Sequence, residues 1–354
     1  MTDWTDPAFQ DADPAASMSD PIDFPTDAQA PAEAFGSGTR LNPAQQEILD
    51  LLGVRAEDLR EYDASLRHDI RHELESGLAP LLDTIGPDRQ LFVSKYPLAQ
   101  VHGCEAKFLA DRDEPFSWTP ATARGTVSHK AVELSIHWPG EPAPLLLVDE
   151  AIASLANSNG SIGDYLRTGT DVELAELRAQ SNERVAKFLE CFPPLQPQWR
   201  PVTESAVKVE LFERRIVLQG RVDLTLGHAR GTTARKLLID FKSGGFSPSH
   251  VDDLRFYALL ETIRIGTPPR MLASYYLDTG RPHPETVTEG LLDAALQRTI
   301  DGATHMVELE IGGAPPTKRS GPACRWCPQL DECTEGRAFI DRTDDDLGRF
   351  DPDE

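Results

Sequence analysis

Cysteines, methionines and aromatic residues are scarce in this chain, and several features are missing altogether. Five cysteines among 354 residues are an odd number, which argues against a framework of disulfide bonds. No apolar run reaches the roughly 20 residues of a membrane-spanning helix, so no membrane insertion is expected. The acidic opening MTDWTDPAFQDADP lacks the basic and apolar segments of a secretory signal peptide. These absences make a cytoplasmic location the expectation.

A phosphate-binding loop of the form G-x-x-x-x-G-K-[ST] is missing as well, which argues against an ATPase. Basic residues are few: 35 Lys and Arg stand against 58 Asp and Glu, for a net charge of −23. Residues 1–40 carry −7 and residues 341–354 carry −5, so the 300 residues between them carry −11. We predict unfolded acidic tails at 1–38 and 341–354. A nucleic acid would need a local basic patch and would bind with strong salt dependence.

An apolar content of 40 % nevertheless supports a packed core. Apolar periodicity and capping residues predict helices at 43–52, 58–82, 126–138, 144–156, 171–192, 249–263 and 285–309. Alternating apolar and polar residues predict two or three antiparallel strands between Trp199 and Gly227, then strands within 236–245 and 271–278. This order indicates an α/β fold, with a mixed β-sheet core flanked by helices and a helical N-terminal insertion. We place that helical region at 39–95 and the main domain at 96–340.

The sequence GRVDLTLG, followed by LLIDFKSGG, is the strongest chemical signal in the chain. Asp240 and Lys242 are two residues apart on one strand and therefore share a face. An antiparallel hairpin would bring Asp223 beside them. Two carboxylates and a lysine suit a Mg²⁺ or Mn²⁺ site acting on a phosphate. The simpler alternative is a surface Asp–Lys ion pair, but LLIDF is too apolar for a surface strand.

These residues resemble the signature of the PD-(D/E)XK nuclease superfamily, whose fold is a restriction-endonuclease-like mixed sheet. The resemblance implies that Asp223 and Asp240 ligate Mg²⁺ or Mn²⁺ and that Lys242 assists catalysis. RecB-like members add a metal-binding histidine on an upstream helix, and His129 in TARGTVSHKAVE matches it. Glu133 lies one helical turn later on the same face. An ordinary histidine on a helix surface is the competing interpretation of His129.

The RecB-like pattern also includes a Gln-x-x-x-Tyr helix that contacts nucleic acid. Tyr257 matches the tyrosine, which implies nucleic-acid binding, although a core aromatic would look the same. Asp253 stands where the glutamine is expected, so that role is lost or altered. Glu204 lies on a strand where the superfamily often has an acidic residue. It could support a metal ligand, but a solvated strand residue is the simpler interpretation.

Four of the five cysteines form a plausible cluster. Cys324, Cys327 and Cys333 in CRWCPQLDEC resemble the C-terminal trio of iron–sulfur nucleases, such as CRISPR-associated adaptation nucleases and AddB-type nuclease domains. Cys104 precedes His129, where the fourth ligand of those proteins lies. The resemblance implies a 4Fe–4S cluster that closes the C-terminus of the fold. Thiolates bind zinc equally well, so zinc stays open. Cys191 fits no motif and is interpreted as a small buried hydrophobe.

Together these features predict a Mg²⁺- or Mn²⁺-dependent deoxyribonuclease, and the RecB-like resemblance points to an exonuclease in DNA repair, recombination or defence. The same resemblance implies single strands or DNA ends as substrate and allows a separate helicase or translocase partner. Two other classes remain open. One is a non-catalytic nucleic-acid-binding subunit with this fold, and the other is a zinc-stabilised interaction module.

Overall fold

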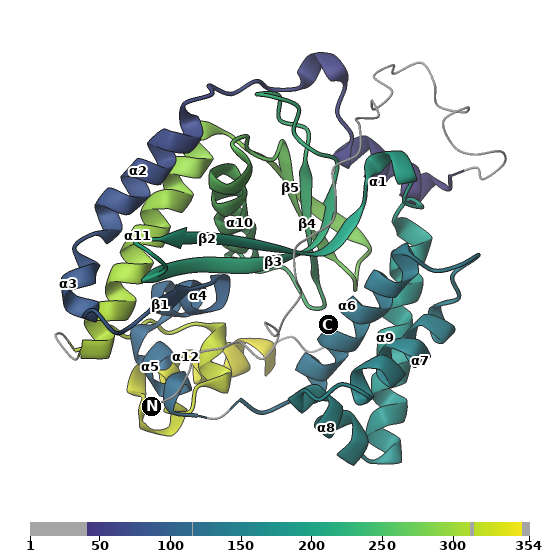
Figure 1. The fold of residues 1–354 in the computed structure, drawn as a ribbon. Coiled ribbons are helices and arrows are strands. Elements are labelled where there is room, and N and C mark those ends of the chain that lie inside the picture. The colour runs from purple at the N-terminus through teal and green to yellow at the C-terminus, as the bar shows by residue number, and fades with distance from the viewer. Residues whose placement is uncertain (1–40, 115, 312–314, 349–354) are drawn as a thin grey trace. The chain divides into compact units, whose positions relative to one another are not determined.

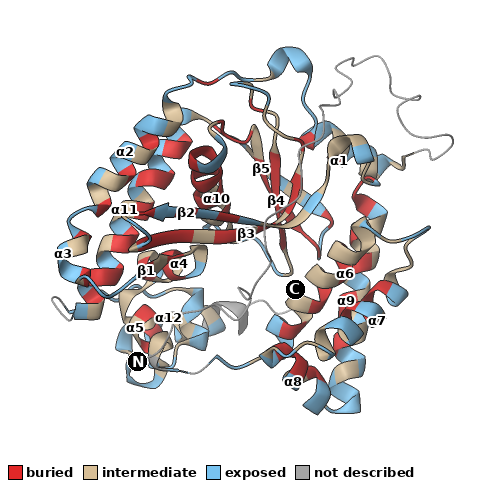
Figure 2. Ribbon diagram, viewed as in Figure 1, coloured by how far each residue is buried: buried red, intermediate tan, exposed pale blue. Residues whose placement is uncertain are grey.

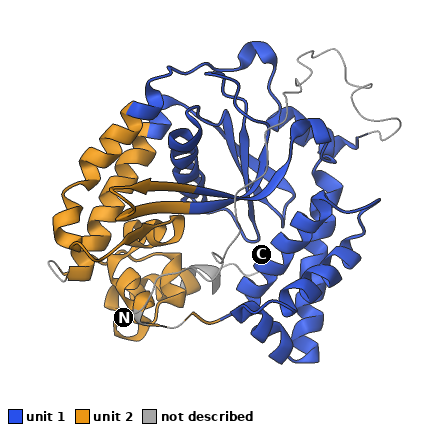
Figure 3. Cartoon of the chain, viewed as in Figure 1, with its two compact units in different colours: residues 1–68, 118–207, 220–292 blue, residues 69–117, 208–219, 293–354 orange. Residues whose placement is uncertain are grey.

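The computed structural model describes residues 41–114, 116–311 and 315–348 (Figure 1). The predicted tail at 1–38 lies outside these residues, as does the end of the predicted tail at 341–354. The chain divides into two compact units (Figure 3). The first comprises residues 1–68, 118–207 and 220–292, and the second comprises residues 69–117, 208–219 and 293–354. In the described residues, no helix combines the length and the apolar character needed to cross a membrane.

Within the described residues the sheet has six strands and is mixed, as predicted. The strand order is β1–β3–β4–β5–β6, and β2 pairs with β3. The β1–β3 and β4–β5 pairs are parallel, whereas β3–β4 and β5–β6 are antiparallel. The strands are β1 Leu91–Val93, β2 Val202–Leu211, β3 Ile216–Leu226, β4 Leu237–Lys242, β5 Met271–Tyr276 and β6 Arg281–Thr286. The apolar strand β4 lies between β3 and β5, in the middle of the sheet, and its residues are therefore buried on both faces.

The first unit contains the helices that cover β4 and β5. These are α1 Pro43–Leu52, α6 Pro120–Ile136, α7 Pro144–Ala156, α8 Ser161–Thr168, α9 Asp171–Cys191 and α10 Ser249–Ile265, with the short helices η1 Ala56–Asp58 and η2 Pro197–Trp199. Helices α1, α6, α7, α8 and α9 share one hydrophobic core with Ile239 and Phe241 of β4. Phe188 and Tyr275 meet Phe241 edge to face in that core. Figure 2 shows this core in red.

The second unit consists mainly of helices and short connections. Its elements include most of α2 Leu66–Leu78 and α11 Glu289–Ile311, together with α3 Leu81–Ile85, α4 Lys95–Gly103, α5 Glu105–Asp113, η3 Pro322–Trp326, η4 Leu330–Glu332 and α12 Thr334–Gly348. Two glycines let helices approach α11 closely. A Cβ at Gly77 of α2 would lie 2.6 Å from Ile300, and one at Gly302 would lie 2.5 Å from Leu98 of α4.

Several predicted helix boundaries are confirmed because the caps are encoded locally. Asn42 caps α1 and forms a reciprocal capping box with Gln45, and Gly53 ends the helix. Helix α7 begins at Pro144 and ends at Ala156, as predicted. Helix α6 starts earlier than the predicted Thr126, because Thr119 and Thr122 form a capping box and Pro120 follows the cap.

Other predicted boundaries were wrong. The helix expected at 58–82 begins only at Leu66, since Tyr62 and Ala234 tie residues 60–62 to the β3–β4 connection by backbone hydrogen bonds. It ends at Leu78 because Pro80 follows. The helix expected from 285 begins at Glu289, and strand β6 occupies 281–286. Helix α12 continues to Gly348, so residues 341–348 of the predicted tail are helical.

Candidate active site

Strand β4 presents Asp240 and Lys242 to the face opposite the shared hydrophobic core. Their side chains form an ion pair, with 2.8 Å between Lys242 Nζ and Asp240 Oδ2. The same ammonium donates to Asp253 Oδ2 of α10 at 2.9 Å. Lys242 therefore lies between two carboxylates, one on its own strand and one on the helix packed above it. Asp240 is only 1 % exposed, so this charged group is buried in the sheet.

Helix α10 reaches three neighbouring strands through residues spaced along one side of the helix. His250 Nδ1 is 3.1 Å from the hydroxyl of Tyr276 on β5. Asp253 contacts Lys242 on β4. Tyr257 packs against Gly220 of β3, where a Cβ would lie 2.1 Å from the tyrosine ring. The spacing i, i+3, i+7 is that of one helix face. One face of α10 therefore contacts β5, β4 and β3.

Asp223 lies where β3 and β4 stop pairing. The antiparallel register runs from Leu226↔Leu237 to Leu224↔Ile239. Immediately beyond it, the backbone N–H of Phe241 donates to Asp223 Oδ2 at 2.6 Å. The carboxylate thus takes a backbone donor at the point where the strands separate. Because Phe241 directly follows Asp240, this hydrogen bond holds the Asp223 carboxylate at the Asp240 end of β4, as expected for an antiparallel hairpin.

His129 of α6 meets this carboxylate from the other side. Its Nδ1 lies 3.6 Å from Asp223 Oδ2, and its ring packs edge to face on Phe241. Gly125, one turn earlier on α6, allows a close approach to Ser243, since a Cβ there would lie 2.8 Å from the serine Oγ. Helix α6 is therefore held against both Phe241 and Ser243, the residues on either side of Lys242. His129 thus lies beside Asp223, and its role as a metal ligand stays a prediction.

Glu204 of β2 is the residue whose importance the sequence understated. Its backbone is left-handed, with φ of 51°, which a non-glycine residue rarely adopts within a strand. Burial raises the pKa of its carboxyl, and the nearby carboxylates of Asp223 and Glu133 raise it further. Arg221, 3.4 Å away, and His129 offset part of this effect. Glu204 thus belongs to the same group of charges as His129 and Asp223.

No group of three or more His, Cys, Asp or Glu side chains is arranged to hold a metal ion as it stands, among the residues that the structure describes. The donor set nevertheless fits a hard divalent cation, because it is rich in carboxylate oxygens with one imidazole. Burial is the first cause of the raised pKa of Glu204, and the carboxylates of Asp223 and Glu133 add to it, so negative charge is crowded at this site. A divalent cation would relieve that crowding.

A family model for the PD-(D/E)XK nuclease superfamily matches residues 93–334, which are 242 of the 354 residues. The chain belongs to the PD-(D/E)XK nuclease superfamily. The match contains every residue of the site described above. No curated protein matches the chain.

Two solved structures resemble the chain at low similarity. One is a presumed exonuclease from Eubacterium rectale, 12 % identical, with a TM-score of 0.43, covering 79 % of this chain and 93 % of that one. The other is the protein SSO0001, 12 % identical, with a TM-score of 0.30, covering 75 % and 96 % of the two chains.

The second unit of this superfamily member gathers the four cysteines of the predicted cluster. Cys104 lies between α4 and α5, and Cys333 directly precedes α12. The segment before the trio returns to Cys104: the N–H of Arg319 donates to Cys104 Sγ at 3.5 Å, and that of Thr317 to Glu105 at 2.8 Å. The chain therefore brings the C-terminal trio back to the upstream cysteine.

Two of the four sulfur atoms lie near the same glycine. A Cβ built at Gly336 would lie 3.4 Å from Cys333 Sγ and 3.5 Å from Cys324 Sγ. Burial raises the pKa of the Cys327 thiol, and the neighbouring Cys104 raises it further. Backbone N–H groups donate to sulfur at Cys104, Cys324 and Cys333. Cys191 instead lies in the hydrophobic core of the first unit at 9 % exposure, which confirms its interpretation as a buried hydrophobe.

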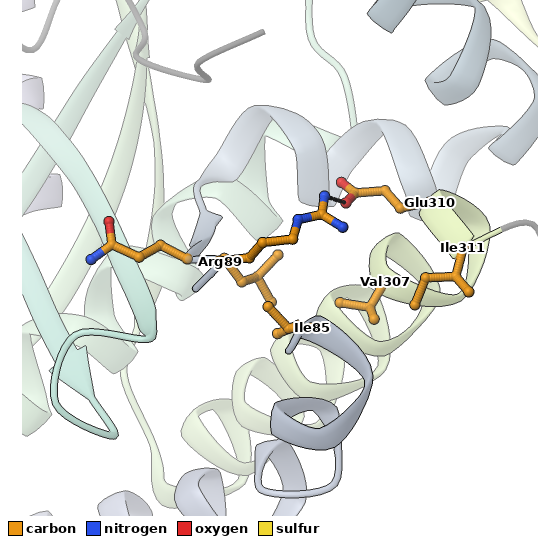
Figure 4. A pocket seen from close by; sticks show the side chains of 7 residues that line it. Ile85, Arg89, Val307, Glu310 and Ile311 are labelled. Carbon is orange, nitrogen blue, oxygen red and sulfur yellow. Dashed lines mark hydrogen bonds and ion pairs between the residues drawn. The ribbon is translucent and has the colours of Figure 1, made fainter. Parts of the chain in front are cut away.

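A small pocket in the second unit, shown in Figure 4, is lined by Ile85, Arg89, Val307, Glu310 and Ile311 among others. Its volume of about 20 Å³ is enough for about one water molecule. Arg89 forms an ion pair with Glu310 at 3.4 Å. None of the predicted site residues lines this pocket, and it is too small for a nucleotide.

Proposed function

We propose that this protein is a metal-dependent deoxyribonuclease of the RecB-like type, acting on single strands or DNA ends. The observation that carries the proposal is the meeting of three elements at the open end of the β3–β4 pair. There α6 supplies His129, β3 supplies Asp223, and β4 supplies Asp240 and Lys242. Membership of the nuclease superfamily makes phosphodiester hydrolysis the chemistry that such a group serves.

Asp223, Asp240 and His129 would hold Mg²⁺ or Mn²⁺, with Glu204 adding negative charge beside them. The bound ion would lower the pKa of a water molecule and neutralise charge on the phosphate. The protein's own contribution is to hold these donors in place. The Phe241 N–H fixes one oxygen of Asp223, and the packing of His129 on Phe241 fixes the imidazole ring.

Lys242 is the cation that would meet the scissile phosphate. Asp240 and Asp253 hold its ammonium from two sides, at 2.8 and 2.9 Å. An ammonium held in advance stabilises developing negative charge without first having to be ordered. Asp253 thus supplies a contact that an amide could also supply, but it adds a negative charge near the path of the phosphate.

Tyr257 enters the proposal as a support of the site. It is 2 % exposed and lies against Gly220, three residues before Asp223. We assign it the task of setting the position of β3 under the nucleic acid. A direct contact between Tyr257 and nucleic acid stays a prediction.

We further propose that Cys104, Cys324, Cys327 and Cys333 bind a 4Fe–4S cluster with a structural role. It would join the α4–α5 corner to the end of the chain, and cross-linking residues so distant in sequence adds on the order of a few kcal/mol of stability. The two sulfur atoms near Gly336 and the backbone donors to sulfur support this assignment. Zinc is the competing occupant, and iron analysis with the visible spectrum of anaerobically purified protein decides between them.

The test of the function is digestion of end-labelled linear DNA and of circular single-stranded DNA with Mg²⁺ or Mn²⁺. We expect metal-dependent loss of the linear substrate, with the circle resistant if ends are required. A protein that binds these substrates but cleaves neither would instead be the non-catalytic subunit. A protein that neither binds nor cleaves, yet holds zinc, would be the interaction module. We also propose a separate helicase or translocase partner for duplex DNA, and adding such a partner to a duplex assay tests this.

A further inference from the structure

Four ring-bearing side chains gather beside Lys242, on the segment that follows β4 and on β5, β6 and α10. They are Phe246, His250, Tyr276 and His283. The ring centroids of Phe246 and Tyr276 are 6.1 Å apart, and those of Phe246 and His283 are 5.4 Å apart. The rings of His250 and Tyr276 are 5.8 Å apart. None of the catalytic roles proposed above uses these side chains.

Tyr276 is the buried member of this group and is held in place by its neighbours. Its side chain is 7 % exposed, and its hydroxyl receives the backbone N–H of Ser247 and lies 3.1 Å from His250 Nδ1. It is also the register partner of Lys242 in the parallel β4–β5 pair, so the two backbones lie about 4.8 Å apart. Burial raises the pKa of the Tyr276 hydroxyl, the nearby Lys242 ammonium lowers it and the Asp240 carboxylate raises it, so the hydroxyl lies near both charges.

Phe246 has 60 % of its surface in solvent, and His283 beside it is also exposed. It follows Lys242 by four residues in the sequence KSGGFSP. Its planes are tilted by 48° to Tyr276 and 62° to His283, so neither ring stacks on it in parallel. Cβ atoms at Gly244 and Gly245 would meet nothing within 4 Å, which leaves the approach to the phenylalanine open. A flat apolar ring therefore faces solvent four residues after Lys242 in the chain.

We propose that Phe246, supported by Tyr276 and flanked by His283, is a stacking site for one unstacked nucleobase next to the scissile phosphate. The inference rests on the proposed nuclease function. Bases in a duplex have their faces covered by neighbouring pairs, whereas a single strand or a frayed end offers a free face. The chain carries a net charge of −23, so contacts that do not depend on phosphate attraction are especially valuable to it. Stacking on an aromatic ring is such a contact and accepts any base.

An isolated exposed phenylalanine needs no function, because apolar side chains are common on protein surfaces. Phe246 differs from such a residue in three ways. Its ring is exposed, it packs against the ring of Tyr276, and it follows Lys242 by only four residues. A ring that only covers the β5–β6 edge would act through its size. A ring that stacks a base acts through its flatness, and the two can be separated by substitution.

The test compares Phe246→Leu, which keeps apolar bulk, with Phe246→Trp, which keeps an aromatic face, in the full-length holoprotein. Binding of fluorescein-labelled oligothymidylate is measured by anisotropy in an Asp240→Asn background, and cleavage of the same oligonucleotide is measured in the otherwise native protein. We expect Phe246→Leu to weaken binding and raise KM on the order of 10-fold, at low and at high salt alike. Phe246→Trp should bind as well as the parent or better. Unchanged binding in Phe246→Leu would overturn the proposal.

A scan with abasic sugars gives the decisive comparison. Oligothymidylates that lack one base at successive positions from the end are bound to each variant. We expect a single position at which the missing base weakens binding to the parent but makes no further difference to Phe246→Leu, since the two changes remove the same contact. Equal losses in both proteins at every position would contradict stacking on Phe246. If the native protein cleaves no substrate, the proposed nuclease function is wrong. The binding measurements would still test the stacking site.

Discussion

Asp223 and His129 approach each other to 3.6 Å between Oδ2 and Nδ1, from a strand and a helix far apart in the sequence. The same Asp223 oxygen accepts the N–H of Phe241, one residue after Asp240. A single carboxylate oxygen therefore links the helix that carries His129 to the strand that carries Asp240 and Lys242. The proposed metal site depends on this link, and it can be tested from the side of the histidine.

Replacing His129 by alanine should weaken metal binding more than it slows the metal-saturated reaction. Loss of an imidazole beside Asp223 removes one donor and loosens the remaining carboxylate, and such changes typically cost 10- to 100-fold, roughly, in metal affinity or activity. The measurement is cleavage of end-labelled DNA over a Mn²⁺ titration. His137→Ala, at the exposed end of the same helix, is the control. A half-saturating Mn²⁺ concentration equal to the parent's would show that His129 is an ordinary surface histidine.

Asp253→Gln should tighten DNA binding at low salt. Glutamine keeps an oxygen that can accept the Lys242 ammonium but removes a negative charge near the phosphate. One charge at such a site is worth about 1 kcal/mol or less, so a gain of about fivefold in affinity is expected, fading as salt screens the charge. Asp252→Asn, the neighbouring carboxylate on α10, serves as the matched control. If Asp253→Gln binds DNA no better than the parent at low salt, Asp253 does not face the substrate.

Gly220→Ala should destabilise the protein by roughly 1–3 kcal/mol, the usual cost of forcing an extra carbon into a packed core. The new Cβ would lie 2.1 Å from the Tyr257 ring, so either β3 or the ring must move. Denaturant unfolding gives the free energy, with Gly290→Ala, where a Cβ meets nothing within 4 Å, as the control. Adding Tyr257→Leu should recover part of the loss. A Gly220→Ala protein as stable as the parent would remove Tyr257 as the support of β3.

The cysteines should divide into four sensitive positions and one indifferent one. Cys104→Ser, Cys324→Ser, Cys327→Ser and Cys333→Ser should each bleach the visible absorbance of the cluster, lower the melting temperature and reduce cleavage indirectly. Cys191→Ser should keep the colour and the activity, because its sulfur lies in the hydrophobic core. The ligand assignment fails if Cys191 is required for the colour and Cys104 is not. If the protein is colourless and holds zinc, the four cysteines bind zinc instead of a 4Fe–4S cluster. That result would leave the proposed nuclease site unaffected.

The parts of the fold that could be predicted are those with local signals. The caps of α1 at Asn42 and Gly53 and the apolar strand β4 are readable from a few neighbouring residues. Strand β6 was missed because RPHPET carries two prolines and no apolar alternation, yet it pairs with β5 as an edge strand, where prolines are tolerated. Residues 60–62 were missed because their extended form is imposed by hydrogen bonds to the β3–β4 connection.

The candidate site shows the same division. Asp240 and Lys242 share a face because two positions on a strand always do, and the resemblance to a nuclease family led to His129 and Asp223. The contact between Asp253 and Lys242 could not be read from the sequence, because it depends on how α10 lies across β4. The left-handed backbone of Glu204 could not be read from the sequence either. A glutamate near the start of a predicted strand was the available hint.

The most direct test of the proposed nuclease site is the rate at which Asp240→Asn cleaves end-labelled single-stranded DNA in saturating Mn²⁺. Asparagine has nearly the same shape, so the fold should survive while a charged metal ligand and the partner of Lys242 are lost. Asp149→Asn, which removes a surface carboxylate paired with Arg178, controls for loss of charge alone. We predict a decrease of at least about 100-fold for Asp240→Asn and none for Asp149→Asn. Cleavage by Asp240→Asn at the rate of the native protein would contradict the assignment of this site.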